Sequence, residues 1–223
     1  MSTMKLENIT EKTGRRYDDA CGTAHGLDLI GERWALLVVR ELMFGPKRFG
    51  DLRAGLPGLS ANVLTQRLEG LEVAGVVVRR KLPPPASVQV YDLTDWGREA
   101  EPIISALGRW AARSPAHDPT LPLSPTSMML SFRTMFDARK AGAAAMTLGF
   151  RFGSEQFVVR VKGGILTAAR EDDGQAEVQI DGTPEAVAAI VYGGAGLETV
   201  SISGDAGVFE RFANFFELPP KAG

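Results

Sequence analysis

Two carboxamide side chains, Asn62 and Gln66, stand one helical turn apart on a predicted helix over residues 60–74. Each carboxamide carries a donor beside an acceptor, a pair that matches N6 and N7 of adenine in the major groove of DNA. The chemistry that these residues could perform is therefore recognition of base edges. At 100° per residue the opposite face of the helix is apolar, and it consists of Leu64, Leu68 and Leu71.

Polar and basic residues around the two carboxamides suit contacts with the phosphate backbone. Ser60 is the predicted N-cap of the helix, where free N–H groups could hold a phosphate, and Thr65 lies beside the base-reading face. Such contacts position a protein on DNA without reading its sequence. The basic candidates are Lys47 and Arg48, before the preceding helix, and Arg79, Arg80 and Lys81, on the following strand.

Both features also have simpler interpretations. The polar outer face of an amphipathic helix is commonly just solvated, and basic residues on an edge strand can serve only to prevent aggregation. The order of the predicted elements favours the DNA-reading interpretation, because helix, turn, helix and basic hairpin follow one another as in a winged helix-turn-helix. The expected elements are helices over 24–31, 33–44, 49–54 and 60–74, then strands over 76–81 and 88–93 joined by a proline loop.

The helix expected over residues 94–113 carries a narrow apolar stripe. Thr94 is its predicted N-cap, and Pro102 should kink or restart it because proline has no N–H to donate. Apolar residues recur at alternating spacings of four and three, which suits a coiled-coil-like contact with another helix. The stripe consists of Trp96, Ala100, Ile103, Leu107 and Trp110.

A proline-rich segment divides the chain. Residues 114–127 contain four prolines and little periodicity, which indicates an extended linker between domains of residues 1–113 and 128–223. After the linker, a helix over 128–141 precedes segments of alternating hydrophobicity, and Gly163-Gly164 signals a hairpin turn. The expected fold class is α+β, with an antiparallel sheet whose apolar face is covered by helices.

The charge balance leaves DNA binding to the first half of the chain. The net charge of −2 divides into +2 for residues 1–113 (16 basic against 14 acidic) and −4 for the remainder (9 against 13). Charge therefore permits DNA binding by the N-terminal domain and argues against it for the C-terminal domain. No apolar run reaches the roughly 18 residues of a membrane span, and the polar N-terminus lacks a signal-peptide core, so no membrane partner and a cytoplasmic location are expected.

Catalytic, metal and cofactor sites are not expected. The chain has two histidines, His25 and His117, and a single cysteine, Cys21, which excludes an internal disulfide and a cysteine-only zinc site. The sequence contains no HExxH, GxSxG, phosphate-loop or dinucleotide-binding pattern. We therefore expect a binding protein rather than an enzyme.

Residues 21–110 resemble the HxlR family of bacterial transcription regulators. The resemblance rests on LDLIGERWALLVVREL, on RFGDL, on LPGLSANVLTQRLEGLEVAGVV and on VYDLTDWG followed by Trp110. It implies a winged helix-turn-helix homodimer, expected to be a repressor, whose terminal helices pair and which binds double-stranded DNA at an inverted-repeat operator. Three successive prolines in the wing depart from the family's pattern and make the wing tip stiff.

The same resemblance implies a role for Cys21, because several family members sense oxidants or electrophiles through a cysteine just before the first helix. A sensing thiol needs a lowered pKa, and Arg15, Arg16 and His25 are the neighbours that could lower it. The alternative is an inert, half-buried cysteine. Because the chain has no second cysteine, any disulfide would be intermolecular.

Residues 128–218 resemble the sterol carrier protein fold in the segments FVVRVKGGILTAAR, VQIDGTPEAVAAIVYGG and SISGDAGVFERFANFF. The resemblance implies an apolar cavity for a fatty-acyl or sterol-like molecule, which could control the regulator. Two alternatives stay open: the same side chains only form a core, or the protein is a lipid-binding carrier whose helical domain serves protein association. The candidate lining residues are Phe150, Phe152, Phe157, Val191, Phe209, Phe212 and Phe216.

Overall fold

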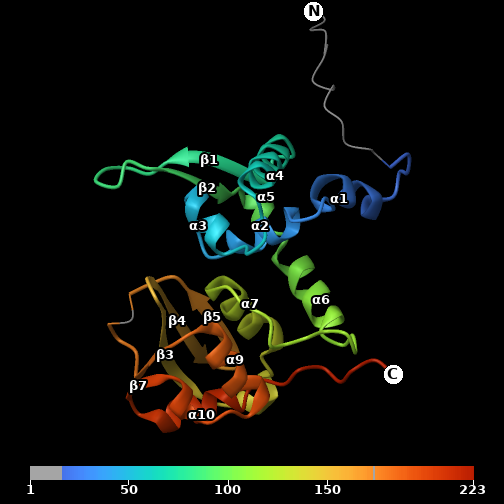
Figure 1. The fold of residues 1–223 in the computed structure, drawn as a ribbon. Helices are drawn as coiled ribbons and strands as arrows, with labels where there is room; N and C mark the ends of the chain where they lie inside the picture. Colours follow the sequence, from blue (N-terminus) through green and yellow to red (C-terminus); the bar gives the residue numbers. More distant parts are fainter. Residues whose placement is uncertain (1–16, 173) are drawn as a thin grey trace, which may run out of the picture.

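The structure, a computed structural model, describes residues 17–172 and 174–223. Figure 1 shows two parts, with the hairpin β1–β2 projecting from one side of the N-terminal part (residues 17–113) and helix α6 running beside the C-terminal part (residues 125–223). The elements of the N-terminal part are α1 (Gly22–Ile30), α2 (Ala35–Glu41), α3 (Phe49–Ala54), α4 (Ala61–Val73), β1 (Val77–Lys81), β2 (Gln89–Leu93), α5 (Asp95–Arg98) and α6 (Glu101–Ala111).

Helix α4 forms as its local sequence predicts. The Ser60 hydroxyl accepts a hydrogen bond from the backbone N–H of Val63 at 3.3 Å, which satisfies one of the free donors at the helix start. The predicted apolar face, Leu64, Leu68 and Leu71, is buried. After the helix, Gly75 has a φ of +72°, a conformation that costs glycine least.

Two helices of the N-terminal part are shorter than expected. Helix α2 begins at Ala35 rather than at residue 33, because Trp34 takes a left-handed φ of 79°. The helix expected over 94–113 is divided into α5 and α6, and Pro102 lies in the first turn of α6. Proline is tolerated there because its missing N–H would have had no partner, so the expected restart at Pro102 is confirmed.

The C-terminal part begins earlier than expected. The Ser124 hydroxyl accepts from the N–H of Ser127 at 3.0 Å, and Pro125 is the first helical residue, so the last three residues of the expected linker start a helix. The elements are α7 (Pro125–Met135), α8 (Ala138–Ala141), β3 (Ala145–Phe152), β4 (Glu155–Lys162), β5 (Ile165–Ala169), β6 (Val178–Asp181), α9 (Pro184–Gly193), the 3-10 turn η1 (Leu197–Thr199), β7 (Ser201–Gly204) and α10 (Ala206–Ala213).

The five strands form one mixed sheet in the order β5-β4-β3-β6-β7. The hairpins β3–β4 and β4–β5 are antiparallel as predicted, but β6 pairs with β3 in parallel, so the expectation of a purely antiparallel sheet was wrong. The chain leaves β5 at one edge and crosses to the far side of β3, and a crossover of this kind makes strands parallel. Helices α9 and α10 lie against one face of the sheet (Figure 1).

A continuous core joins the two parts. Helix α7 is buried on most of its sides because it contacts α2 and α6 as well as α9 and β5. The ring of Phe44, just after α2, meets Phe157 of β4 edge-on with 5.7 Å between ring centroids. The Arg133 guanidinium of α7 lies over the Phe44 ring at 4.4 Å. Within the described residues, no helix is long and apolar enough to span a membrane.

Candidate nucleic-acid interface

The two carboxamides predicted to read bases are exposed on one face of α4. Asn62 and Gln66 lie opposite the buried leucines, and within the described part of the chain neither side chain has a hydrogen-bond partner. A polar group without an internal partner can form a hydrogen bond with an external one without breaking a hydrogen bond inside the protein. Their donor and acceptor atoms are therefore available to base edges.

The two supporting residues on α4 already make local hydrogen bonds. The Ser60 hydroxyl oxygen accepts from Val63, and the Thr65 hydroxyl donates to the carbonyl of Ala61 at 3.1 Å. Ser60 can still donate its O–H to a phosphate, and the Thr65 oxygen keeps acceptor capacity. Both residues are exposed at the N-terminal half of α4, where the helix dipole favours an anion.

Four of the five predicted phosphate-contacting cations are exposed, namely Arg48, Arg79, Arg80 and Lys81. Arg48 is the N-cap residue of α3, and Lys81 ends β1 at the base of the wing loop. Arg79 is 54% exposed and makes a long ion pair of 3.7 Å with Glu72 of α4. An exposed pair of this length contributes little to stability, so Arg79 can exchange it for a phosphate.

Arg80 has a second task that the sequence did not reveal. Its guanidinium donates to Asp92 of β2 at 2.7 and 3.1 Å, and Arg98 of α5 donates to the other oxygen of the same carboxylate at 3.0 Å. Asp92 is buried and needs both partners, since an unpaired buried charge is strongly destabilising. Arg80 therefore links β1 to β2 through Asp92, and Arg98 links the same carboxylate to α5.

The expectation that Lys47 contacts phosphate does not fit its position. Lys47 is 4% exposed, and its ammonium group donates to Glu41 at 2.9 Å and to Thr126 at 3.0 Å. A buried lysine with internal acceptors cannot reach a DNA backbone without breaking those bonds. The basic pair Lys47-Arg48 is thus divided, with Arg48 facing solvent and Lys47 facing the core.

The apolar stripe of α5 and α6 is largely exposed. Trp110 is 72% exposed, and α6 has no buried residue, although one side of it contacts α7. Ala100 is the one stripe residue that is buried, at the junction between the two helices. Large apolar side chains gathered along one exposed helix face are typical of an interaction surface. The exposed stripe consists of Trp96, Ile103, Leu107 and Trp110.

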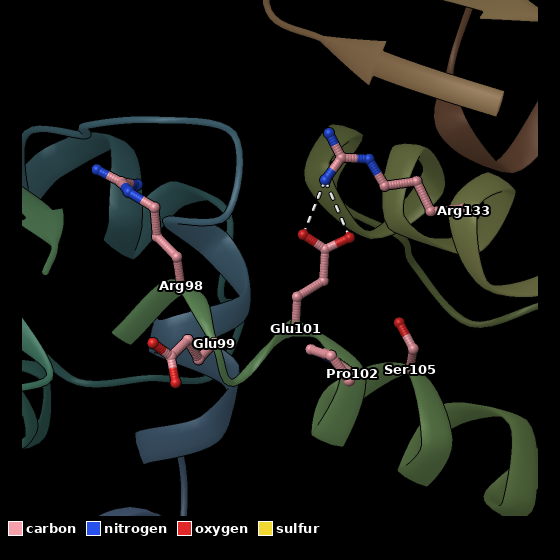
Figure 2. A pocket seen from close by; sticks show the side chains of 6 residues that line it. All are labelled: Arg98, Glu99, Glu101, Pro102, Ser105 and Arg133. Carbon is pink, nitrogen blue, oxygen red and sulfur yellow. Dashed lines mark hydrogen bonds and ion pairs between the residues drawn. The ribbon is translucent and has the colours of Figure 1, made fainter. Parts of the chain in front are cut away.

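Figure 2 shows how α6 is held to the C-terminal part. Arg133 of α7 donates two hydrogen bonds to the Glu101 carboxylate, at 2.8 and 3.0 Å, across a hollow of about 510 Å³. Arg133 also donates to the carbonyl of Ala168 in β5, and the neighbouring Arg98 is paired with Asp92. Because each guanidinium of the hollow already has a carboxylate partner, these charges hold α5 and α6 in place rather than await an anion.

Cys21 is exposed, not half-buried, and it is the N-cap residue of α1. Backbone N–H groups of Thr23 and then Ala24 stabilise the thiolate and hold the pKa of Cys21 below its ordinary value. The expected neighbours Arg15 and Arg16 lie outside the described residues. His25 donates its backbone N–H to the Cys21 carbonyl at 3.1 Å.

The aromatic residues proposed to line a cavity pack against one another. Phe150 and Phe212 are fully buried with 6.0 Å between ring centroids, and Phe212 meets Phe216 at 4.7 Å. Phe152 and Phe157 are in contact at 6.3 Å, and Phe209 lies 6.0 Å from Phe150. Val191 is buried beside them. These distances are those of a filled aromatic core.

Comparisons with known proteins match the N-terminal part. The model of the HxlR-like helix-turn-helix family matches residues 29–118. The uncharacterized HTH-type transcriptional regulator YvaP of Bacillus subtilis is 40% identical over 85 residues, which cover 38% of this chain and 79% of YvaP. The HTH-type transcriptional regulator YodB of the same organism is 35% identical over 83 residues, covering 37% of this chain and 74% of YodB. A solved structure of reduced YodB aligns with 44% of this chain and 98% of that chain, at 31% identity and a TM-score of 0.40.

Proposed function

The chain belongs to the family of HxlR-like helix-turn-helix proteins, and from that premise we propose that it represses transcription as a homodimer bound to an inverted-repeat operator. Its curated relatives are HTH-type transcriptional regulators, and this protein is a DNA-binding transcriptional regulator of the same kind. The observation that carries the operator proposal is the pair of free carboxamides on α4, Asn62 and Gln66, flanked by the exposed cations Arg48, Arg79 and Lys81.

The exposed stripe on α5 and α6 supports the homodimer. A two-fold dimer buries the same surface of both copies, so one apolar stripe is self-complementary. Pairing of α6 with its copy would remove Ile103, Leu107 and Trp110 from water together. Two copies of α4 related by that axis would read two half-sites about one helical turn apart, which is the geometry of an inverted repeat.

Replacement of Gln66 by alanine is expected to weaken binding to the promoter region of the protein's own gene by about 1–3 kcal/mol per half-site, because a bidentate base contact is lost. Binding to a random duplex of equal length should change little, and fluorescence anisotropy with both duplexes measures the difference. Gln175→Ala, which removes an exposed glutamine in the C-terminal part, is the matched control. Equal losses on both duplexes would remove the base-reading role.

We further propose that chemistry at Cys21 controls DNA binding. The proposal is supported by the lowered pKa and the exposure of the thiol, and by the contact of α1 with the recognition helix α4. Glu32, just after α1, also pairs with Arg67 of α4 at 3.3 Å. The relative YodB has a solved structure described as quinone-bound, and HypR has structures in oxidized and reduced forms. Modification of the thiol would shift α1 and thereby α4.

The pH dependence of Cys21 alkylation tests the source of its reactivity. The thiolate reacts and the thiol does not, so the midpoint of the iodoacetamide rate against pH is expected below that of a model cysteine peptide. Thr23→Pro removes the N–H that stabilises the thiolate most, at a position that tolerates proline, and should move the midpoint upward. Thr23→Ala keeps that N–H and should move it less. A wild-type midpoint at or above that of the peptide would contradict the proposal.

For the C-terminal part we propose a domain of sterol-carrier-like fold, covering residues 128–223, beside a winged-helix domain over 1–113. A sheet backed by α9 and α10 around an aromatic interior supports this architecture. We also propose that this part binds an apolar ligand, and native mass spectrometry of the freshly expressed protein tests this. An apolar adduct would support a ligand, whereas an unmodified mass together with the packed rings would assign those residues to the core alone.

A further inference from the structure

A largely buried polar cluster joins the N-terminal part to the C-terminal part. We call it the Lys47 clamp, and its members are Glu41, Lys47, Ser124, Thr126 and Glu155. The Lys47 ammonium donates to Glu41 at 2.9 Å and to Thr126 at 3.0 Å, and it lies 3.6 Å from the Glu155 carboxylate. Glu41 and Thr126 are fully buried. The exposed residues proposed above to contact DNA are not members of the clamp.

The two buried charges of the clamp, Lys47 and Glu41, each have several partners, which restrains their positions. An ammonium group has three protons, and Lys47 has three acceptors around it. The second oxygen of Glu41 accepts from the Ser124 hydroxyl at 2.6 Å and from Arg40 at 2.9 Å. Burying these charges is costly unless every partner is in place, so the arrangement tolerates little displacement. Two of the three acceptors of Lys47 belong to the C-terminal part.

The backbone of the same lysine pairs with strand β2 of the wing. Lys47 donates its N–H to the Tyr91 carbonyl at 3.0 Å and accepts from the Tyr91 N–H at 2.9 Å, an isolated antiparallel bridge to β2. Residue 47 therefore extends the wing sheet by one bridged residue. It also directly precedes Arg48, the N-cap of α3. The side chain is anchored in one part of the molecule while the backbone holds the wing of the other.

We infer that Lys47 is a positioning residue for DNA binding and that Thr126 and Glu155 of the C-terminal part fix the wing through it. The C-terminal part thus stabilises the position of the wing, whether or not it binds a ligand. This inference rests on the proposed function. The alternative is that Lys47 contacts phosphate directly. The two interpretations predict different effects on DNA binding when the partners of Lys47 are replaced.

The test compares Lys47→Met with Thr126→Val, which cannot touch DNA but removes an acceptor of the clamp. Both are expected to lower the affinity for the own-promoter duplex by about 3- to 30-fold, the usual range for residues that act through others. The double variant should bind no more weakly than Lys47→Met alone, because the two side chains act as one unit. Lys140→Met, which removes a half-exposed lysine paired with Glu217, is the matched control.

Salt dependence separates the two interpretations. A positioning residue leaves the slope of log affinity against log salt unchanged, whereas loss of a phosphate contact reduces it by about 1. A reduced slope in Lys47→Met together with wild-type binding by Thr126→Val would overturn the inference. If Lys47→Met fails to fold, Thr126→Val and Glu155→Gln decide, since each keeps the lysine and removes or neutralises one acceptor.

Hydrogen exchange in the DNA-free protein tests the coupling between Lys47 and the wing without any operator DNA. The Tyr91 amide is protected by the bridge to Lys47, so it should exchange several-fold faster in Thr126→Val and in Lys47→Met than in the wild type. Unchanged Tyr91 exchange in both variants would overturn the inference. If the wild type binds no DNA while Tyr91 exchange rises, the proposed function fails and the structural coupling stands.

Discussion

Replacement of Leu107 by glutamate is expected to convert the protein to a monomer and to lower its affinity for promoter DNA by about 100-fold or more. Leu107 is half exposed in the middle of the α6 stripe. In a two-fold dimer the change places a carboxylate from each copy in one apolar seam, and burying an unpaired charge costs several kcal/mol. Each 1.4 kcal/mol is a tenfold change in affinity.

Sedimentation velocity and fluorescence anisotropy measure the two consequences separately. Ile165→Glu is the control, because Ile165 is an equally apolar residue, 67% exposed, at the start of β5 and outside the stripe of α5 and α6. It should leave both the dimer and DNA binding intact. A Leu107→Glu protein that sediments as the wild-type species would show that α6 is not the dimer contact.

Replacement of Phe212 by alanine is expected to lower the free energy of unfolding by about 3–5 kcal/mol, the usual cost of removing a buried ring. Phe212 is fully buried on α10 and packs against Phe132 at 5.0 Å and Phe216 at 4.7 Å. Neighbours that are held by the sheet and α7 cannot collapse into the space that the ring leaves. The loss should appear as a lower midpoint of urea denaturation.

The same variant decides whether these rings form a core or line a ligand site. Leu121→Ala, in the exposed segment before α7, is the control and should change the midpoint little. A cost below about 1 kcal/mol for Phe212→Ala would mean that the ring borders open space, as a ligand-lining residue does. Stabilisation of the wild type by added oleate would point the same way.

Local sequence predicts helix α4 well, because its cap, its apolar face and its end depend on neighbouring residues. The spacing of Leu64, Leu68 and Leu71 determines which face of α4 is buried, and so places Asn62 and Gln66 on the outer face. Ser60 caps the helix, as predicted, and Gly75 with its positive φ follows it. A helix whose start, face and end are all encoded between Ser60 and Gly75 needs no distant contact to specify it.

Lys47 shows where local rules fail. A lysine next to an arginine before a helix has the sequence pattern of a solvated basic pair, and nothing nearby indicates burial. Its acceptor Thr126 lies 79 positions along the chain, and Glu155 lies further still. A buried ion pair is specified by tertiary packing alone, so the sequence could not separate Lys47 from Arg48.

The C-terminal sheet shows a second limit of the same kind. Gly163-Gly164 predicts the β4–β5 hairpin because a turn is a local feature. The parallel pairing of β3 with β6 depends on a crossover between distant strands, for which alternation of apolar residues gives no signal. Likewise, alternation predicts that Phe150 is buried, and only its packing against Phe132 and Phe212 favours core over cavity.

A footprint on the promoter region of its own gene is the most direct test of sequence-specific DNA binding. At moderate salt we predict two protected half-sites related by an inverted repeat, with centres one helical turn or a multiple of it apart. Gln66→Ala should weaken protection at both half-sites, since both copies of α4 would carry the change. Uniform protection without sequence preference, or none at all, would contradict the account.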